Sequence, residues 1–205
     1  MTVEAHTGAV VLAAGQSRRM GSPKMVLPWG DHTVIEQVAG TLIAAGVGQI
    51  VVVTGGARDR VEAALSGYPV ELVHNPDYAR AEMLSSLQAG IRHLNPGVEA
   101  CLIVLGDQPG IEVNVIRAVM DRFRESKERA RLVVPSYKMR RGHPWLAARS
   151  LWNELLAMQP GQTLRDFLHA HSGEITYVEV DSPSILKDMD TPEDYQAQRP
   201  IHPER

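Results

Sequence analysis

The sequence predicts an α/β fold, in which helices cover both faces of a doubly wound, mostly parallel sheet in a three-layer α/β/α arrangement. Five short apolar runs rich in β-branched residues are spread along the chain. Several are apolar on both faces, as parallel strands are when helices cover both sides of the sheet. Segments with apolar residues at helical spacing lie between these runs. Strands that alternate with helices form right-handed βαβ units, and such units build an open, doubly wound sheet.

The individual elements follow from the same patterns. Strands are expected at residues 8–12, 50–53, 70–73, 101–105 and 132–134. Helices are expected where apolar residues recur every three or four positions, at 34–42, 83–94 and 113–123. After Ser136 the pattern is less regular, with helices expected near 150–158 and 164–169 and a strand at 175–180. Because such sheets bind ligands beyond the carboxyl ends of their strands, functional residues should follow the strands directly.

The length of the chain predicts a single domain, residues 1–205. A chain of 205 residues can bury one full hydrophobic core. We see no long linker, internal repeat or low-complexity block that would divide it. The ordered core is expected over about residues 7–195. The tail from Gln196 to Arg205 holds two prolines and no apolar periodicity, so it is expected to be loose.

The composition disfavours several classes of protein. A net charge of -3 argues against binding to nucleic acid, so any anionic ligand must be held by a local site. The single cysteine, Cys101, lies in an apolar run and cannot form an intramolecular disulfide. The first 30 residues hold no long apolar stretch, so neither a signal peptide nor a membrane span is expected. A cytoplasmic protein that does not contact the membrane is the default expectation.

The segment after the first strand has the features of an anion-binding loop. Ala13-Ala14-Gly15 is small enough to let a ligand approach the backbone, and successive N–H groups in such a turn form an anion-binding nest. Arg18 offers a planar fork for phosphate oxygens, and Lys24 supplies a compact positive charge. The alternative is a solvated βα loop with ordinary surface charges.

Two common phosphate loops do not fit this segment. The dinucleotide-binding fingerprint G-x-G-x-x-G fails because Gly15 and Gly21 are six residues apart with no glycine in the required middle position. The P-loop pattern fails because Lys24 lies three residues beyond Gly21 instead of directly after it. The loop is therefore poor in glycine and carries its own cations.

The segment from Leu12 to Lys24 instead resembles the signature L-x-x-G-x-[ST]-x-R-M-G-x-x-K of the MobA-like nucleotidyltransferases. The resemblance implies a Rossmann-like fold, similar to that of the sugar-nucleotide and isoprenoid cytidylyltransferases. It also implies that main-chain groups of residues 12–15 read the edge of a nucleotide base. Arg18 and Lys24 would then neutralise the triphosphate and act as catalytic residues.

A second candidate site follows the fourth predicted strand, at Gly106-Asp107-Gln108-Pro109. An aspartate at the end of a strand can reach the ligand crevice, and Mg²⁺ is usually held by one or two carboxylates together with substrate phosphates. The alternative is an Asx turn before Pro109. The element resembles the family's G-D-x-P motif, which implies that Asp107 is a catalytic metal ligand. Gln108 is expected to contact the acceptor.

A third candidate site lies near the C-terminus. Thr191-Pro192-Glu193 has the pattern of a helix start, with Thr191 as the N-cap and Pro192 at the first helical position. The preceding aspartates resemble the family's D-[IVM]-D-T-P-E-D element. The resemblance implies that Asp190 is the second metal ligand, with Asp188 as the alternative.

Two further elements complete the resemblance. Gly142-His143-Pro144 matches the family's G-H-P element, which implies that His143 helps to shape the acceptor pocket. A lone histidine is more often structural, so we do not expect a general base. Around Asn75 and the serines of 85–86, the resemblance implies that Asn75 and Ser85 contact the nucleotide and that Ser86 contacts the acceptor. Glu82 replaces the usual glycine there, and an ordinary helix start is the alternative.

The resemblance implies that an acceptor phosphate attacks the α-phosphorus of a nucleoside triphosphate and releases pyrophosphate, with Mg²⁺ as the cofactor. Ala14 favours the branch that transfers a cytidylyl group from CTP to molybdopterin, and a recipient molybdoenzyme or its chaperone is then a conceivable partner. The alternatives are guanylyl transfer, or a sugar or alditol phosphate as acceptor. A non-catalytic, cofactor-delivering nucleotide-binding protein is disfavoured, because it would not need Lys24, Asp107 and Asp190 together.

Overall fold

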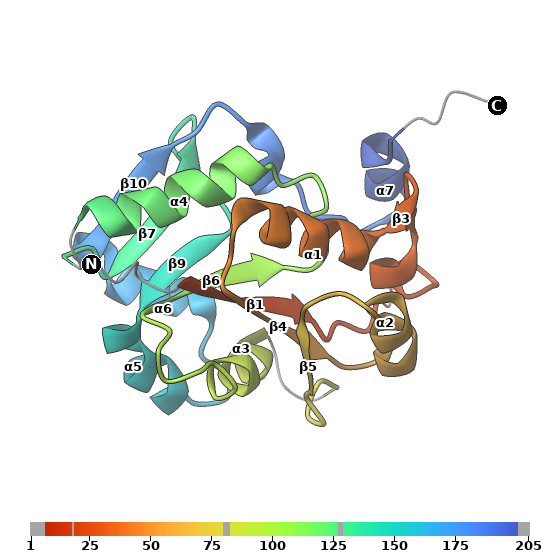
Figure 1. Cartoon of the computed structure of the whole chain (residues 1–205), viewed down its shortest axis with the longest axis horizontal. Helices are drawn as coiled ribbons and strands as arrows, with labels where there is room; N and C mark the ends of the chain where they lie inside the picture. Colours follow the sequence, from red (N-terminus) through yellow and green to blue (C-terminus); the bar gives the residue numbers. More distant parts are fainter. Residues whose placement is uncertain (1–6, 18, 80–82, 127–128, 201–205) are drawn as a thin grey trace.

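The computed structural model describes residues 7–17, 19–79, 83–126 and 129–200. Within these residues an eight-stranded sheet has the order β10-β7-β9-β6-β1-β4-β5, with β8 paired to β7 (Figure 1). The strands are β1 (Thr7–Ala13), β4 (Gln49–Thr54), β5 (Glu71–His74), β6 (Ala100–Leu105), β7 (Leu132–Tyr137), β8 (Arg140–Arg141), β9 (Trp145–Ala148) and β10 (Ile175–Glu179). A separate two-stranded sheet joins β2 (Pro28–Trp29) and β3 (His32–Thr33).

The central strand β1 sets the position of the functional loops. It pairs in parallel with both β4 and β6, and Leu12 lies opposite Val53 on one side and Leu105 on the other. Its residues are apolar on both faces, so alternate side chains enter the two cores above and below the sheet. The segments that follow β1 and β6 therefore leave the sheet side by side.

Helices cover both faces of the sheet, which confirms the predicted three-layer α/β/α fold (Figure 1). One face is covered by α1 (Val34–Ala45), α2 (Arg58–Ala64) and α4 (Val113–Glu125). The other is covered by α3 (Met83–Ile91), α5 (Trp152–Ala157) and α6 (Leu164–Ala170). The short helices are η1 (Lys24–Val26), η2 (Arg149–Leu151), η3 (Ser172–Glu174) and η4 (Pro183–Leu186), and α7 (Pro192–Gln198) closes the described chain.

The start of α7 has the predicted capping pattern. The Thr191 hydroxyl accepts a hydrogen bond from the backbone N–H of Asp194, and the Asp194 carboxylate accepts one from the N–H of Thr191 in return. Pro192 occupies the first turn, where its missing N–H costs nothing. Residues 196–198, which were expected to belong to a loose tail, are instead part of α7.

Strand β9 and helix α2 were not expected from the sequence. Strand β9 runs antiparallel to both β6 and β7 and separates them, so the sheet is mixed instead of purely parallel at this point. Its four residues are too few to show a period and lie in the irregular region after Ser136. Helix α2 buries only Val61, so it shows no clear apolar stripe.

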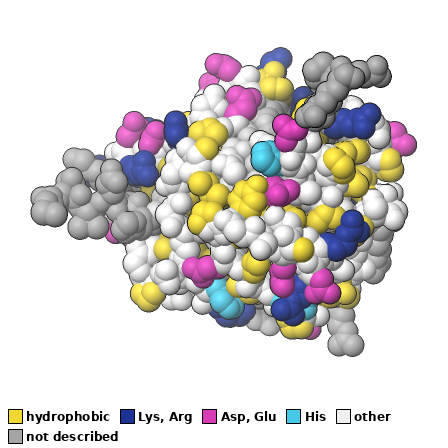
Figure 2. Space-filling view, turned by 45° about the vertical axis from the view of Figure 1, so that its right-hand side comes forward, with side chains coloured by type: hydrophobic (Ala, Val, Ile, Leu, Met, Phe, Trp, Pro, Cys, Tyr) yellow, Lys and Arg dark blue, Asp and Glu magenta, His cyan; other side chains and the backbone are white. Residues whose placement is uncertain are grey.

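The described surface carries both signs of charge. On the face shown in Figure 2, acidic and basic side chains are interspersed and not gathered by sign. Among the described residues, none of the helices is long and apolar enough to span a lipid bilayer.

Candidate active site

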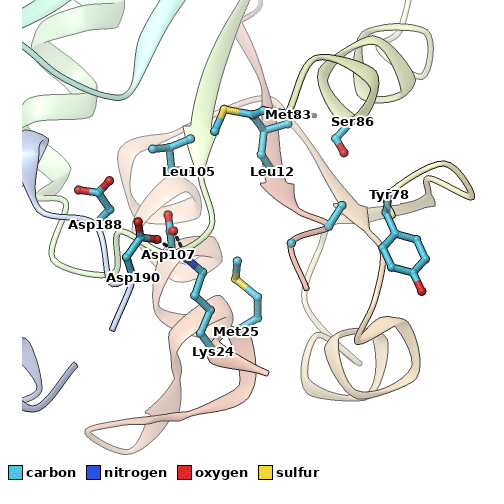
Figure 3. Close-up of a pocket in the computed structure, with 12 residues that line it drawn as sticks. Leu12, Lys24, Met25, Tyr78, Met83, Ser86, Leu105, Asp107, Asp188 and Asp190 are labelled. Atoms are coloured by element: carbon cyan, nitrogen blue, oxygen red, sulfur yellow. Dashed lines mark hydrogen bonds and ion pairs between the residues drawn. The ribbon is translucent and has the colours of Figure 1, made fainter. Parts of the chain in front are cut away.

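A pocket of about 300 Å³ opens at the carboxyl ends of β1 and β6 (Figure 3). Its lining comes from six parts of the chain: the end of β1 with the loop after it, η1, the turn after β5, the start of α3, the end of β6 with the turn after it, and the segment before α7. The lining residues are Leu12, Ala14, Gly15, Lys24, Met25, Tyr78, Met83, Ser86, Leu105, Asp107, Asp188 and Asp190. Predicted nucleotide-binding and metal-binding residues that are far apart in the sequence thus share one cavity.

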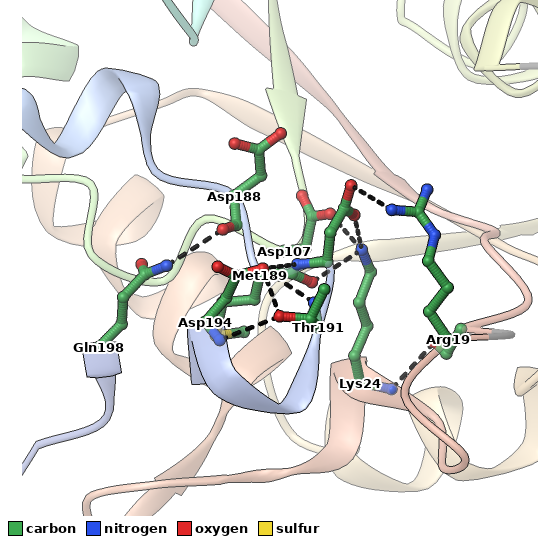
Figure 4. A network of polar contacts seen from close by, with 10 residues as sticks. Arg19, Lys24, Asp107, Asp188, Met189, Thr191, Asp194 and Gln198 are labelled. Carbon is green, nitrogen blue, oxygen red and sulfur yellow. Dashed lines mark hydrogen bonds and ion pairs between the residues drawn. The ribbon is translucent and has the colours of Figure 1, made fainter. Parts of the chain in front are cut away.

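Lys24 lies at the centre of the polar contacts in this pocket (Figure 4). Its ammonium group donates to the carboxylate of Asp107, to Oδ1 of Asp190 at 3.2 Å and to the carbonyl oxygen of Met189 at 3.1 Å. The backbone N–H of Lys24 donates to Oγ of Ser17 at 3.0 Å, which fixes the turn of η1 against the loop after β1. The two predicted metal ligands therefore meet at one cationic atom.

The charge state of Lys24 follows from these contacts. Burial alone would lower the pKa of the Lys24 ammonium, but the adjacent carboxylates of Asp107 and Asp190 outweigh burial and raise that pKa above its usual value. Lys24 is therefore charged throughout the physiological pH range, as a group that neutralises phosphate must be.

Residues before α7 hold Asp190 in place. Met189 is fully buried against Trp29 and Val34, and its backbone N–H donates to the carbonyl oxygen of Asp107 at 3.2 Å. The Asp194 carboxylate accepts from the backbone N–H of Asp190 at 3.2 Å. The capping contacts of α7 thus position a carboxylate beside the end of β6.

Asp188 has a different environment from Asp190. Its side chain lines the same pocket, but it lies apart from Lys24, and its carbonyl oxygen accepts from Nε2 of Gln198 at 3.0 Å (Figure 4). Asp190 thus shares a cationic partner with Asp107, whereas Asp188 acts on the Asp107 carboxyl by charge repulsion, which adds to the larger effect of burial and helps to raise the pKa of that carboxyl.

The donor set fits a divalent metal whose coordination is completed by phosphates. Asp107 and Asp190 present hard carboxylate oxygens that already reach one shared cationic atom. In the described parts of the chain, no group of three or more His, Cys, Asp or Glu side chains is arranged to hold a metal ion. Mg²⁺ typically takes one or two carboxylates and fills its remaining positions with water and substrate phosphates.

The loop after β1 forms the opposite side of the pocket. Leu12, Ala14 and Gly15 line it, whereas the Ala13 side chain is buried on the other face of the sheet. The Ala13 side chain therefore does not contribute to the pocket. Ala14 and Gly15 have the small size that lets a ligand approach the backbone closely.

Gly55, directly after β4, supports this loop and was not expected from the sequence. A Cβ atom at this position would lie 2.3 Å from the carbonyl oxygen of Ala14 and 2.8 Å from Cβ of Tyr78. Atoms cannot approach so closely, so any side chain at Gly55 must displace the loop. The Gly55-Gly56 pair after a strand was the sequence signal for this close approach.

We predict that Gly55→Ala raises the KM for the nucleotide by about 10-fold or more, because the loop backbone must shift away from its binding position. Steady-state kinetics with circular dichroism as a check on folding measure the effect. Gly97→Ala is the matched control, since a Cβ there meets nothing within 4 Å. An unchanged KM in Gly55→Ala would show that the nucleotide does not depend on this loop.

Asn75, Ser85 and Ser86 form a hydrogen-bonded cluster near the start of α3, and of the three only Ser86 lines the pocket. The amide of Asn75 is buried and donates to Oγ of Ser85 at 2.9 Å and of Ser86 at 3.0 Å, while its oxygen accepts from the N–H of Asp77. Ser86 lines the pocket, but Asn75 and Ser85 do not. Asn75 thus orients Ser86, and its expected contact with the nucleotide does not fit its position. Glu82 lies outside the described residues.

Gln108 does not point toward the pocket, which corrects its expected role as an acceptor contact. Its side chain is buried and lines a small separate void with Val38, Leu42 and Ile116. Consecutive side chains in the turn after β6 leave on opposite sides, so Asp107 faces the pocket and Gln108 faces the core.

His143 lies in the wall of a second cavity of about 700 Å³. This cavity adjoins the first, because Met83 lines both. Its wall is mostly apolar and carries cationic or titratable side chains, and the residues are Met83, Leu84, Arg141, Gly142, His143, Trp145, Thr163, Leu164, Arg165, Leu168 and His169. Arg141 also lines this cavity, and its guanidinium lies 5.4 Å from the ring centre of Tyr177.

Burial lowers the pKa of His143 to about 4. An unfolded chain binds this proton near pH 6.5, so as the pH falls the unfolded state is protonated before the folded state. We therefore predict that the free energy of unfolding falls between pH 6.5 and 4, by up to about 2 kcal/mol at pH 5 from this residue. Urea unfolding of His143→Asn should show a correspondingly smaller loss. His32→Asn, at an exposed histidine, is the control, and equal pH slopes for the native chain and His143→Asn would exclude the effect.

The structure adds Arg19 to the candidate site. Nη1 of Arg19 lies 3.4 Å from Oδ2 of Asp190, across the opening of the pocket (Figure 4). Arg18 lies outside the described residues. The family signature itself contained the signal, because its arginine directly precedes the Met-Gly pair, which here is Met20-Gly21.

A cation-bearing loop after β1 and two carboxylates at the same edge of a doubly wound sheet together define a nucleotidyltransferase. Comparison with known families gives the same class. The sequence profile of the MobA-like NTP transferase domain matches residues 9–175, and the chain belongs to this family.

Two curated relatives match nearly the whole chain. One is the molybdenum cofactor cytidylyltransferase of Escherichia coli (strain K12), 26% identical over 187 residues, with 91% of this chain and 92% of the relative covered. The other is the nicotine blue oxidoreductase of Paenarthrobacter nicotinovorans, 29% identical over 195 residues, with 90% and 92% covered.

Solved structures show the same fold. Rv0371c of Mycobacterium tuberculosis H37Rv superposes with a TM-score of 0.81 at 27% identity, with 95% of this chain and 98% of that chain covered. A complex of Rv0371c with manganese superposes with a TM-score of 0.77, with 94% and 97% covered.

Proposed function

We propose that this nucleotidyltransferase transfers a cytidylyl group from CTP to the terminal phosphate of molybdopterin in a Mg²⁺-dependent reaction. The observation that carries the proposal is the meeting of Lys24, Asp107 and Asp190 beside the loop of residues 12–15. A protein that only binds a nucleotide has no need of two carboxylates at one cationic centre, so this geometry favours catalysis.

In this reaction an oxygen of the acceptor phosphate attacks the α-phosphorus, and the bond from that phosphorus to the oxygen bridging to the β-phosphate breaks. Pyrophosphate is the leaving group and carries away the electron pair. Asp107 and Asp190 would hold the metal, which would supply charge neutralisation at the reacting phosphates. Lys24 and Arg19 bind the triphosphate oxygens, and backbone groups of residues 12–15 orient the nucleoside.

The chain needs no general base for this step. A phosphate acceptor is already ionised at neutral pH, so catalysis consists of alignment and stabilisation of charge. His143 fits this scheme as a wall of the neighbouring cavity, because burial favours its neutral form and it lies outside the first pocket.

The second cavity supports a large acceptor. It is bigger than the first, mostly apolar, and carries Arg141, Arg165 and His169 among its lining residues. An apolar wall with a few cationic groups suits a ring system that bears an anionic substituent. Molybdopterin has this chemistry, and the lining of both cavities by Met83 supports the binding of such an acceptor beside the nucleotide.

The choice of CTP rests on Ala14, which lines the first pocket, and on the likeness to the E. coli cytidylyltransferase. A relative named as an oxidoreductase shows that overall similarity does not fix the reaction, so the site residues carry the assignment. Guanylyl transfer, or another phosphorylated acceptor, would use the same Lys24, Asp107 and Asp190.

The test is pyrophosphate release with Mg²⁺ and molybdopterin and with each nucleoside triphosphate in turn. We expect release with CTP and little with GTP, ATP or UTP. Release with GTP alone would replace the cytidylyl assignment by a guanylyl one. Release only with a sugar or alditol phosphate would replace the acceptor. Binding of a nucleotide without release under any of these conditions would overturn the enzymatic proposal.

A further inference from the structure

Ion pairs at the first pocket link four charged side chains in a row, in the order Arg19, Asp190, Lys24 and Asp107. We propose that Lys24 and Arg19 are exchangeable counter-ions: they neutralise Asp107 and Asp190 in the free protein and pass to the triphosphate when nucleotide binds. Metal binding at the two carboxylates is then coupled to nucleotide binding. This inference rests on the proposed function, because it takes the carboxylates as the metal ligands.

The contacts of the carboxylate oxygens carry the inference. Oδ2 of Asp107 and Oδ1 of Asp190 both accept from the ammonium of Lys24, and Oδ2 of Asp190 faces Arg19 at 3.4 Å. In the described structure, protein cations thus engage three of the four oxygens of this pair. Figure 3 shows the Lys24 side chain pointing toward the carboxylates of Asp107 and Asp190.

Lys24 and a divalent cation compete for the same oxygens. A metal bound by Asp107 and Asp190 would lie within a few ångströms of the Lys24 ammonium, where two positive charges repel strongly in a poorly solvated site. Lys24 must therefore leave the carboxylates before the metal binds tightly. The triphosphate gives it a new partner, because its oxygens are anionic and the pocket extends from Lys24 toward residues 12–15.

The ligand count reinforces this order of events. No third His, Cys, Asp or Glu side chain of the described residues completes a metal site with the two carboxylates. A metal alone would thus meet a resident ammonium and an incomplete ligand set. Phosphate oxygens attract Lys24 away from the two carboxylates, and they also serve as additional ligands for the metal.

The two cations should contribute unequally. The Lys24 side chain is 11% exposed and contacts both carboxylates, whereas that of Arg19 is 73% exposed and contacts one. An exposed ion pair is screened by water and contributes little. Lys24 is therefore the main determinant of the coupling, and Arg19 adds a smaller effect.

The experiment measures the binding of Mn²⁺ alone by the loss of its free electron paramagnetic resonance signal, and the binding of CTP in EDTA by calorimetry. We expect Lys24→Met to bind Mn²⁺ about 10-fold more tightly than the native protein, because the competing charge is gone. The same variant should bind CTP more weakly. A residue that only binds phosphate would change the second affinity and leave the first unchanged.

Three variants make this result specific. Lys24→Arg keeps a positive charge and should keep the weak affinity for Mn²⁺. Lys187→Met removes an exposed lysine from the segment leading to Asp190 and should leave both affinities unchanged. Adding Asp107→Asn to Lys24→Met should abolish the gain, since the metal loses a ligand. Arg19→Gln tests the exposed cation and keeps the inference open to refutation if Lys24→Met does not fold.

The inference is overturned if Lys24→Met folds, as judged by circular dichroism, and binds Mn²⁺ no more tightly than the native protein. The assay contains no acceptor, so an error in the assigned base or acceptor does not affect it. If the Mn²⁺ affinity is unchanged in Lys24→Met while the native protein transfers CMP, the counter-ion exchange is rejected and the proposed reaction stands.

Discussion

Asp107→Asn should lower the rate of nucleotidyl transfer by roughly 1,000-fold or more, while the fold remains intact. The substitution keeps the size of the side chain but removes the charge that, in the proposed site, binds the metal and pairs with Lys24. Metal-assisted neutralisation of the reacting phosphates is then lost. Steady-state pyrophosphate release measures the rate, and circular dichroism checks the fold.

Asp190→Asn and Asp188→Asn are the matched comparisons. Asp190 shares the Lys24 ammonium with Asp107, so its substitution should cost nearly as much. Asp188 lines the pocket away from that ammonium, so its substitution should cost no more than about 10-fold. Near-normal turnover in Asp107→Asn would refute its role, and a larger loss in Asp188→Asn than in Asp190→Asn would exchange the two metal ligands.

The second large effect is expected at Lys24. Lys24→Ala should weaken the binding of the metal–triphosphate complex by about 100-fold, because a charge-assisted contact to the phosphates is lost in a poorly solvated site. In kinetics this appears as a raised KM for the nucleotide and a reduced kcat. Titration with a non-hydrolysable triphosphate measures the affinity separately from turnover.

Lys187→Ala is the control for this prediction, since it removes an exposed lysine outside the pocket. Its nucleotide affinity should match that of the native protein. If Lys24→Ala also bound the triphosphate normally, the phosphates could not lie against Lys24. The loop of residues 12–15 would then hold a different part of the substrate.

Most of the fold could be predicted because its central strands are buried on both faces. Strands such as β1 and β6 read as continuous apolar runs, and the turns after them contain unusual polar residues. The capped start of α7 was also predictable, because Thr191 and Pro192 act within one helical turn. By contrast, β9 gains its stability from neighbours on both sides that its own four residues do not reveal.

The site was predictable at the level of residues on a shared edge, but not at the level of side-chain direction. Lys24 and Asp107 come together because the parallel strands β1 and β6 end at one edge, whereas Asp190 reaches the site from the segment before α7, which only the family resemblance indicated. Gln108 directly follows Asp107 yet faces the core, and Asn75 supports Ser86 from behind. Such directions depend on tertiary packing, which local sequence does not encode.

The most direct test of nucleotidyl transfer follows the α-phosphate itself. CTP labelled at its α-phosphate is incubated with Mg²⁺, molybdopterin and the protein, and both products are quantified. We predict that the label appears in the acceptor product and that one pyrophosphate is released for each label transferred. Label that remains in CTP, or appears only in free CMP, would contradict the assignment of this chain as a transferase to molybdopterin.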